Sequence, residues 1–231
     1  MGGIGRVARG SPAGPPDLGL APAALFRRWV VPDKAFLVVD VQNDFCPGGS
    51  LEVRAGDEVV PFINAKRREF ELVVFTQDWH PANHQSFASQ HPGKRPFDVI
   101  DLHSQSQVLW PDHCVQGTRG AEFHPGLDVR AEDPVFRKGQ LAAVDSYSGF
   151  LDNDRRNETG LREFLQQQGV AEVYVVGLAT DVCVRFTVLD AVQFGFRAFI
   201  YPAGCRAVNL QPDDERNAYR AMEEAGAVVL P

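Results

Sequence analysis

The sequence VVGLATDVCVRFT, Val175–Thr187, joins two apolar segments of different kinds. Residues 173–176 are typical of a short buried strand, and residues 182–194 have the apolar character of a largely buried helix. Between them Gly177–Asp181 makes an abrupt turn, and Cys183 follows at the start of the helix. A strand that leads directly into a buried helix is the repeating unit of α/β proteins. The stretch therefore predicts an α/β fold, in which Cys183 is either an inert apolar side chain or one that the turn presents.

The same alternation of strand-like and helix-like segments extends over most of the chain. Continuous apolar runs predict strands at 35–39, 72–76, 134–137, 173–176, 198–201 and 228–230. Helices with start and stop signals are expected at 59–70, 161–168, 182–194 and 213–225. We therefore expect a single domain over residues 34–231, a doubly wound (Rossmann-like) six-stranded parallel sheet with helices on both faces. Residues 1–33, rich in Gly and Pro at their start, are expected to form a flexible N-terminal extension.

Composition excludes several classes of partner. The 231 residues carry a formal charge of -7 and no cluster of Lys and Arg, which argues against nucleic acid as a partner. The apolar runs are too short to span a bilayer, and the N-terminus lacks the apolar core of a signal peptide. Four cysteines are scattered without paired spacing, which favours a reducing, cytoplasmic setting. A small-molecule partner remains the expectation, and the composition leaves open whether the protein is a monomer or a homo-oligomer.

Charged and metal-ligating residues follow the predicted strands at the point where each strand ends. Asp40 follows the first strand, and Asp78 with His80 follows the second. In open α/β sheets, ligands bind beyond the carboxyl ends of the strands. With His113, which lies farther along the same long connection, Asp78 and His80 make a set of two imidazoles and one carboxylate that suits Zn, Fe(II) or Mn. His84 is an additional candidate ligand, whereas His91, His103 and His124 are expected to be ordinary loop residues.

Lys138 ends the third predicted strand, and Cys183 follows the fourth. A lysine is usually a solvated surface residue, but beside a cysteine its charge favours the thiolate and lowers the pKa of the thiol. A position in the first turn of a helix acts in the same direction. Buried free cysteines are usually inert, and we expect this of Cys46, Cys114 and Cys205. From the residue pattern alone, the inert and the reactive interpretation of Cys183 are equally supported.

The long connection 78–132 shows no clear periodicity, and loops of that length are usually functional.

Six motifs occur together in one order: LVVDVQNDFCPGGSL, FTQDWHPANHQSFA, WPDHCVQGTRGAEFHP, FRKG, DSYSGF and VGLATDVCVRFT. In this combination the chain, from Phe36 to the C-terminus, resembles the nicotinamidase (pyrazinamidase) branch of the isochorismatase-like cysteine hydrolases. The resemblance implies a catalytic triad of Asp40, Lys138 and Cys183. It also implies an oxyanion hole made by the N–H groups of Ala179 and Cys183, with a cis peptide at Leu178–Ala179. The further residues that it implies line the substrate pocket (Phe45, Trp110, Tyr147 and Leu178) or bind one divalent metal, Zn by preference (Asp78, His80 and His113, with His84 as an additional candidate).

The activity that the resemblance implies is hydrolysis of nicotinamide to nicotinate and ammonia, as in NAD salvage, with pyrazinamide as a second substrate. Three alternatives stay open. One is another amidohydrolase of the same superfamily that acts on a different small amide. The second is a metallohydrolase in which the metal activates water and Cys183 is inert. The third, a metal-stabilised interaction domain without activity, would leave the convergence of Asp40, Lys138 and Cys183 without a reason.

Overall fold

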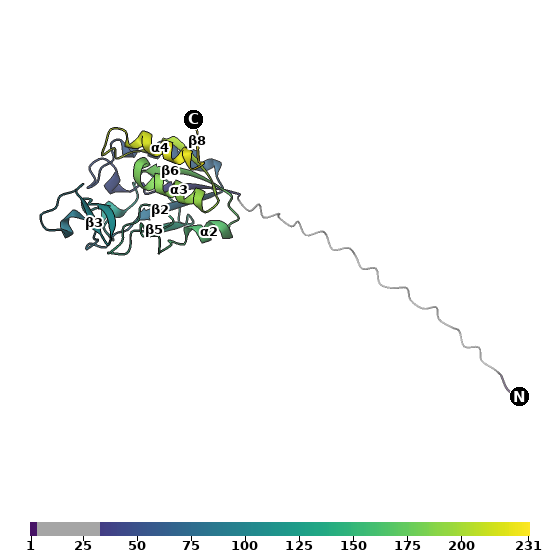
Figure 1. The fold of residues 1–231 in the computed structure, drawn as a ribbon. Helices are drawn as coiled ribbons and strands as arrows, with labels where there is room; N and C mark the ends of the chain where they lie inside the picture. The colour runs from purple at the N-terminus through teal and green to yellow at the C-terminus, as the bar shows by residue number, and fades with distance from the viewer. Residues whose placement is uncertain (4–32) are drawn as a thin grey trace. The chain divides into compact units, whose positions relative to one another are not determined.

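Six parallel strands form the central sheet of the computed structural model, which describes residues 1–3 and 33–231 (Figure 1). In chain order the strands are β1 (Lys34–Val39), β2 (Leu72–Asp78), β5 (Val135–Lys138), β6 (Glu172–Leu178), β7 (Arg197–Arg206) and β8 (Val228–Val229). Their order in the sheet is β5-β2-β1-β6-β7-β8, and every neighbouring pair is parallel. The six predicted strands and the doubly wound topology are confirmed. The extension predicted for residues 1–33 lies almost entirely outside the described residues.

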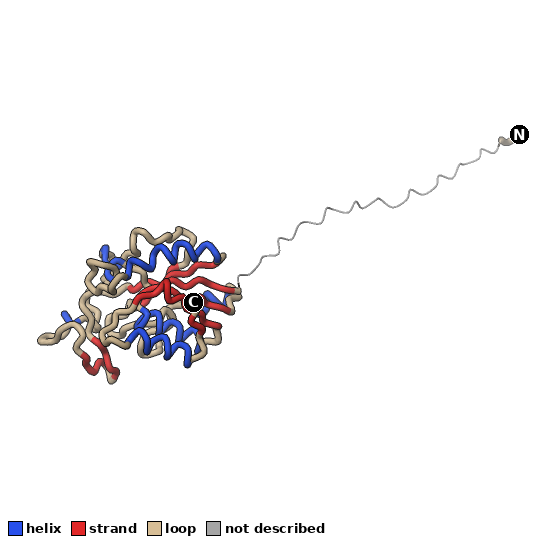
Figure 2. The backbone as a smooth tube through the Cα atoms, turned by 90° about the horizontal axis from the view of Figure 1, so that it is seen from above, coloured by secondary structure: helices blue, strands red, loops and turns tan. Residues whose placement is uncertain are grey.

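Helices cover both faces of this sheet, as Figure 2 shows. They are α1 (Val59–Lys66), α2 (Leu161–Gln167), α3 (Arg185–Gln193) and α4 (Asp214–Glu224). On one face Leu165 of α2, Val188 of α3 and Met222 of α4 join one buried apolar cluster. On the other face Val60 and Ile63 of α1 pack with residues of the long connection after β2 in a second cluster. Because both faces are covered, the strands need the continuous apolar sequences from which they were predicted.

Two helix boundaries differ from the prediction by more than one residue. A 3-10 helix, Arg67–Glu69, continues α1, so the regular α-helix is shorter than the predicted 59–70. The cysteine lies in a π-helical turn, Thr180–Val184, that precedes α3, so the helical segment begins two residues earlier than expected. π-Helical turns are rare and occur frequently at functional sites. Cys183 is thus presented by an irregular helical turn rather than by the first turn of an α-helix.

The connection between β2 and β5 contains regular structure that its sequence did not indicate. β3 (Val99–Leu102) and β4 (Gln105–Val108) form an antiparallel hairpin, separate from the central sheet. Short 3-10 helices lie at Ala88–Gln90 and Arg119–Ala121, and two more lie earlier in the chain at Asn43–Phe45 and Gly56–Glu58. The expectation of a wholly irregular connection was therefore wrong. The hairpin is largely exposed and half polar, so neither of its strands carries the apolar run that marks a buried strand.

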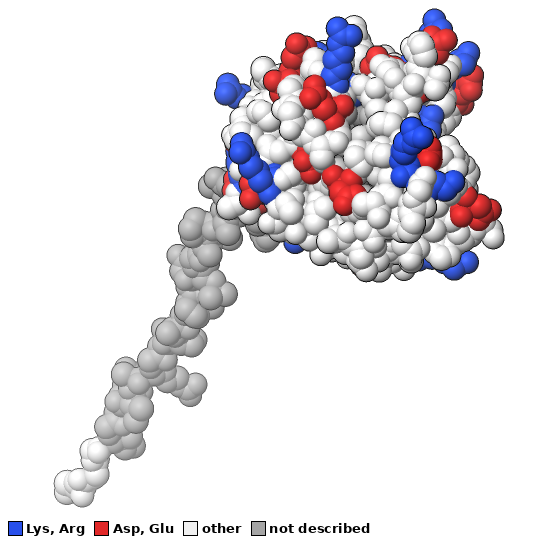
Figure 3. Space-filling view, turned by 90° about the vertical axis from the view of Figure 1, so that its left-hand side faces the viewer, with Lys and Arg blue, Asp and Glu red and all other residues white. Residues whose placement is uncertain are grey.

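On the face drawn in Figure 3, basic and acidic side chains are interspersed rather than gathered by sign. One arginine that composition alone would place on the surface, Arg67, is instead buried and ion-paired with Asp133 at 3.0 Å. Within residues 1–3 and 33–231, no helix is long and apolar enough to cross a membrane.

Candidate active site

The carboxyl ends of four strands bring the predicted site residues to one edge of the sheet. Asp40 directly follows β1, Asp78 ends β2, Lys138 ends β5, and Cys183 lies just beyond β6. Because neighbouring strands are parallel, Asp78 and Lys138 are direct partners in the β2–β5 register. Gly177 allows β6 to approach β1 here: it has a φ of +122°, and a Cβ at this position would lie 2.0 Å from the carbonyl oxygen of Val39. The sheet thus places two carboxylates, an ammonium and a thiol side by side.

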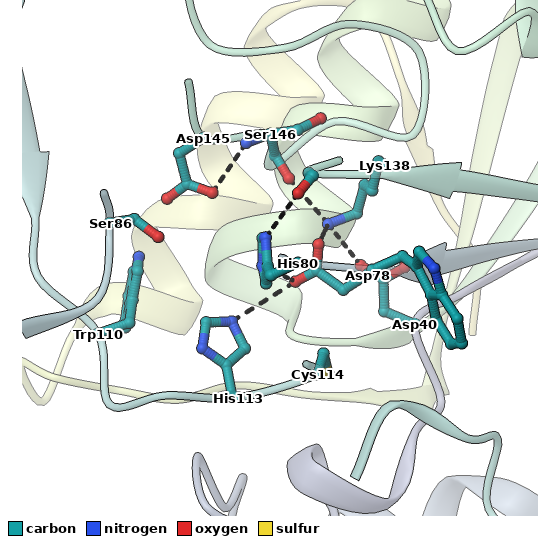
Figure 4. A network of polar contacts seen from close by, with 12 residues as sticks. Asp40, Asp78, His80, Ser86, Trp110, His113, Cys114, Lys138, Asp145 and Ser146 are labelled. Carbon is teal, nitrogen blue, oxygen red and sulfur yellow. Dashed lines mark hydrogen bonds and ion pairs between the residues drawn. The ribbon is translucent and has the colours of Figure 1, made fainter. Parts of the chain in front are cut away.

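The ammonium of Lys138 is the centre of this group. It has no exposed surface and contacts every other member. Its Nζ atom lies 2.9 Å from Asp40 Oδ2, 2.9 Å from Asp78 Oδ1 and 2.9 Å from the carbonyl oxygen of Ser146 (Figure 4). Cys183 Sγ lies 3.5 Å from the same atom. Burial opposes its charge, but the two carboxylates outweigh this and raise the pKa of Lys138 well above its usual value. Lys138 is therefore a permanent cation in this site.

The carboxyl of Asp40 is wholly buried and is held by two partners. Thr76 donates its hydroxyl to Asp40 Oδ1 at 2.7 Å, and Lys138 pairs with Oδ2. Burial raises the pKa of Asp40, and the nearby charge of Asp78 adds to this, although Lys138 opposes both. A carboxylate with a raised pKa, in contact with a thiol, is suited to accept a proton from it.

Cys183 is buried, and its thiol is not pre-ionised. Burial raises the pKa of Cys183 well above its usual value; Lys138 lowers it, but Asp40 and Asp78 add to the rise. Lys138 lowers this pKa, as expected, but the net shift is upward rather than downward. Desolvation and two carboxylates outweigh a single ammonium. The resting group is therefore a thiol, and Asp40 lies near enough to contribute to the rise in its pKa.

The turn before the cysteine has the backbone geometry that the resemblance implied. The peptide bond between Leu178 and Ala179 is cis. The carbonyl oxygen of Ala179 accepts the N–H groups of Val182 at 3.1 Å and Val184 at 3.0 Å, which closes the π-helical turn around Cys183. Within residues 33–231, no backbone carbonyl accepts the N–H of Ala179. Ala179 itself lines the pocket described below.

Asp78, His80 and His113 direct three lone pairs at one point. His80 donates Nδ1–H to the carbonyl oxygen of Gly139 at 2.9 Å, and His113 donates Nδ1–H to that of Pro111 at 2.8 Å. Each Nε2 atom is then an acceptor, and these atoms lie 3.1 and 3.5 Å from Asp78 Oδ2. Buried acceptors that face one another need a cation between them, and His80 Nε2 has no hydrogen-bond partner. Backbone carbonyls that fix the far side of each imidazole are the usual support of a metal site. The set therefore fits a divalent metal ion.

His84 is held in a different role. Its Nδ1 atom accepts the backbone N–H of Ser86 at 3.2 Å, so its proton is on Nε2, which faces the carbonyl oxygen of Val144 at 3.2 Å. Burial, with the charge of His80, lowers the pKa of His84 to about 4. The ring packs against His80, with 4.3 Å between centroids, and the ligand atoms of His80, His84 and Asp145 lie within 4.8 Å of one another. Both nitrogens of His84 are nevertheless occupied by protein partners.

An aromatic and apolar pocket opens above Cys183. Of the four residues predicted to line it, Phe45, Trp110 and Tyr147 do so, whereas the side chain of Leu178 packs into the core beside Gly56. The indole N–H of Trp110 donates to the Tyr147 hydroxyl at 3.3 Å, which fixes the two rings nearly perpendicular. The remaining wall is formed by residues that sequence reasoning missed: Leu51, Asp145, Val182 and Val208. Asp145 and Val182 lie inside motifs quoted above, but Val208 lies in a loop without any motif.

Gln42 is another residue of the site that was not predicted from the sequence. Its side-chain amide clamps the main chain of Asp78: Oε1 accepts the Asp78 N–H at 2.8 Å, and Nε2 donates to the Asp78 carbonyl at 2.8 Å. Nε2 also donates to the carbonyl of Ala121 at 2.9 Å. The available signal was a polar residue two positions after Asp40, inside the first of the six motifs. Gln42 thereby fixes the residue that contacts both Lys138 and the two histidines.

A doubly wound parallel sheet that gathers a cysteine, a lysine and an aspartate beside a pocket at the carboxyl ends of its strands is the arrangement of an α/β enzyme. The chain belongs to the isochorismatase family, because the model of the Isochorismatase domain matches residues 34–231. It is 48% identical over 203 residues to the nicotinamidase of Escherichia coli, a match that covers 86% of this chain and 95% of that one.

The chain is also similar to solved structures of nicotinamidases and pyrazinamidases. The structure of a nicotinamidase and pyrazinamidase from Acinetobacter baumanii has a TM-score of 0.83 and 48% identity, over 86% of this chain and 95% of that one. The pyrazinamidase of Pyrococcus horikoshii, solved in complex with zinc, has a TM-score of 0.72 and 35% identity, over 86% of this chain and 99% of that one. The resemblance drawn from the six motifs is confirmed at the level of the family.

Proposed function

We propose that this protein is a metal-containing cysteine amidohydrolase that converts nicotinamide to nicotinate and ammonia in NAD salvage, and that it also hydrolyses pyrazinamide. The observation that carries this proposal is the contact of Lys138 with Asp40 and Cys183 below an aromatic pocket, beside three converging metal-ligand atoms. The names of the relatives at 48% identity support the choice of substrate. Asp40, Lys138 and Cys183 are the proposed catalytic triad.

The pocket suits a flat heteroaromatic amide. Phe45, Trp110 and Tyr147 offer apolar surfaces for a ring, and Cys183 lies in the same wall. Asp78, His80 and His113 would hold the divalent metal, for which we propose Zn on the strength of the imidazole and carboxylate ligands. A metal ion held there would supply a positive partner for the ring nitrogen of the substrate and would thereby orient the ring. The side chains that line the pocket then set the position of the carboxamide relative to the thiol.

The chemical step follows from the protonation states. Asp40 accepts the proton of Cys183 as the sulfur attacks the carboxamide carbon, so a C–S bond forms and the carbonyl oxygen becomes an oxyanion. We assign the N–H groups of Ala179 and Cys183 as donors to that oxyanion. Asp40 then returns the proton to the departing nitrogen, and ammonia leaves with cleavage of the C–N bond. Lys138 remains protonated and balances the charge of Asp40 and Asp78 throughout.

Water completes the cycle. It attacks the thioester and gives one proton to Asp40, the C–S bond breaks, and the acid leaves as nicotinate after its second proton passes to solvent. Asp40 finally returns the proton to the sulfur of Cys183. One water molecule is consumed for each amide hydrolysed.

Ammonia release from nicotinamide tests the proposal. We expect turnover by the wild type, loss of turnover with Cys183→Ala, and retention with Cys205→Ala, which changes a buried cysteine outside the site. A chelator should reduce turnover, and added Zn should restore it. Turnover that survives in metal-loaded Cys183→Ala would favour the metallohydrolase. Absence of ammonia from nicotinamide, together with release from another small amide, would place the protein elsewhere in its family.

A further inference from the structure

Asp181, two residues before Cys183, has a buried carboxylate that contributes to none of the steps above. Each of its oxygens accepts one backbone N–H from a distant segment. Oδ1 accepts that of Val208 at 2.9 Å, and Oδ2 accepts that of Asn209 at 2.7 Å. Hydrogen bonds between a backbone N–H and a carboxylate are among the stronger ones in proteins. Asp181 therefore ties the cysteine turn to the segment that contains Val208.

That segment, residues 207–210, is the first part of the connection between β7 and α4. Its other anchor is at the far end, where the side-chain oxygen of Asn209 accepts the N–H of Glu215 at 3.0 Å. In the described part of the chain, no other hydrogen bond joins residues 207–210 to the turn 179–184. Connecting segments with few hydrogen bonds are generally the mobile parts of a fold. The carboxylate of Asp181 is thus the link that sets where this connection lies relative to Cys183.

Val208 lines the pocket together with Val182 and Cys183. We propose that Asp181 is a positioning residue, which holds Val208 as a wall of the substrate pocket and thereby determines how closely the ring of the substrate is enclosed. This inference rests on the proposed function, because it takes the occupant to be a heteroaromatic amide. Val208 is the specificity-determining contact, and Asp181 acts through it.

An aspartate is the residue type that this link requires. Two consecutive N–H groups need two acceptor atoms, and only a carboxylate offers two on one short side chain. In Asp181→Asn, the amide NH₂ would face one of the N–H groups as a second donor. One hydrogen bond would be lost, and the two donors would repel each other. The substitution changes the link with almost no change of volume.

The kinetic test combines Asp181→Asn, Val208→Ala and the double variant. For each single variant we expect KM for nicotinamide to rise roughly tenfold while kcat stays within about twofold. The pH profile of kcat should not move, because Asp40, Lys138 and Cys183 keep their contacts. Discrimination against ring-methylated nicotinamides should weaken. Because Asp181 acts through Val208, the double variant should resemble either single variant.

Asp101→Asn is the matched control, since Asp101 is an exposed aspartate that accepts the N–H of Ser104 at 2.9 Å in the distant β3–β4 turn. It should leave both KM and kcat unchanged. Additive effects of Asp181→Asn and Val208→Ala, or a shifted pH profile in Asp181→Asn, would show that Asp181 acts directly on the chemistry, and would overturn the proposal.

Hydrogen exchange of the peptide that covers residues 207–211 tests the link without any substrate, so its result is independent of the proposed function. The amides of Val208 and Asn209 should exchange faster in Asp181→Asn than in the wild type, and Asp101→Asn should match the wild type. Unchanged exchange in Asp181→Asn would overturn the inference even if nicotinamide is the substrate. Faster exchange would support it even if the wild type failed to hydrolyse nicotinamide.

Discussion

Asp78 and Lys138 form a buried ion pair, with 2.9 Å between Oδ1 and Nζ, and the other oxygen of the same carboxylate faces the two imidazoles of the metal-ligand group. One side chain therefore belongs to two charge clusters. His80 and Lys138 together lower the pKa of Asp78 well below its usual value, although burial opposes this. Asp78 is an anion at any pH at which the protein works, and its two oxygens couple the candidate metal site to the candidate catalytic group.

Asp78→Asn should abolish metal binding and activity together. The substitution removes the anionic ligand between His80 and His113 and leaves Lys138 with a single carboxylate partner. We expect metal affinity to fall by roughly 100-fold or more. Metal content after dialysis, measured by atomic spectroscopy, and ammonia release provide the check. Asp112→Asn is the control, because it changes an exposed aspartate beside His113, and it should retain its metal. If Asp78→Asn also retained its metal, Asp78 would not be a metal ligand.

Lys138→Met should destabilise the fold as well as abolish activity. It leaves Asp40 and Asp78 buried and close together without their shared cation, and breaking a buried pair in this way costs about 3–5 kcal/mol. Urea denaturation at neutral pH measures the change. Lys66→Met is the control, because Lys66 pairs with Glu69 at the surface and such pairs contribute about 0–1 kcal/mol. Equal midpoints for the two variants would refute the account of Lys138. The double variant Asp40→Asn, Lys138→Met should recover part of the loss.

Cys183 should react slowly with iodoacetamide at neutral pH. Because its pKa is raised well above the usual value, the thiolate fraction is small and grows about tenfold for each pH unit. The rate of alkylation, followed by mass spectrometry of the Cys183 peptide, should still be climbing at pH 9. A small free thiol, with a pKa of about 8.5, should level off near that pH under the same conditions. Rapid, pH-independent labelling would mean that the resting group is a thiolate.

We expect the protein to lose stability on acidification because of His84. Its folded pKa of about 4 lies below the ordinary value of 6.5, so between these values the unfolded chain binds more protons at this residue than the folded chain. Stability then rises with pH across that window, and acidification to pH 5 should cost about 2 kcal/mol. Free energies of unfolding at pH 7 and pH 5 measure this. His84→Gln should lose that part of the dependence, whereas His103→Gln, at an exposed position, should keep it. Identical slopes for His84→Gln and the wild type would exclude His84 as the cause.

The fold could be predicted from sequence to the extent that burial leaves a local pattern. β1 and β6 are covered on both faces, so apolar side chains occupy nearly every position and the runs are visible without a structure. The β3–β4 hairpin carries no such run, because its strands are exposed and half polar, and it was therefore not predicted. The π-helical turn was likewise missed, because its geometry depends on hydrogen bonds to Ala179 rather than on a residue period.

The sequence by itself determined which residue types follow each strand, and the parallel topology then required Asp40, Asp78, Lys138 and Cys183 to meet at one edge. Only the tertiary structure decided what each group does there. The thiol of Cys183 keeps its proton because burial and two carboxylates outweigh Lys138, the opposite of what its place in the sequence suggested. The two ring nitrogens of His84 contact Ser86 and Val144. Val208, whose N–H is accepted by the carboxylate of Asp181, lines the pocket. Residue identity is local, but charge, protonation and orientation depend on desolvation and on partners that the fold brings from elsewhere in the chain.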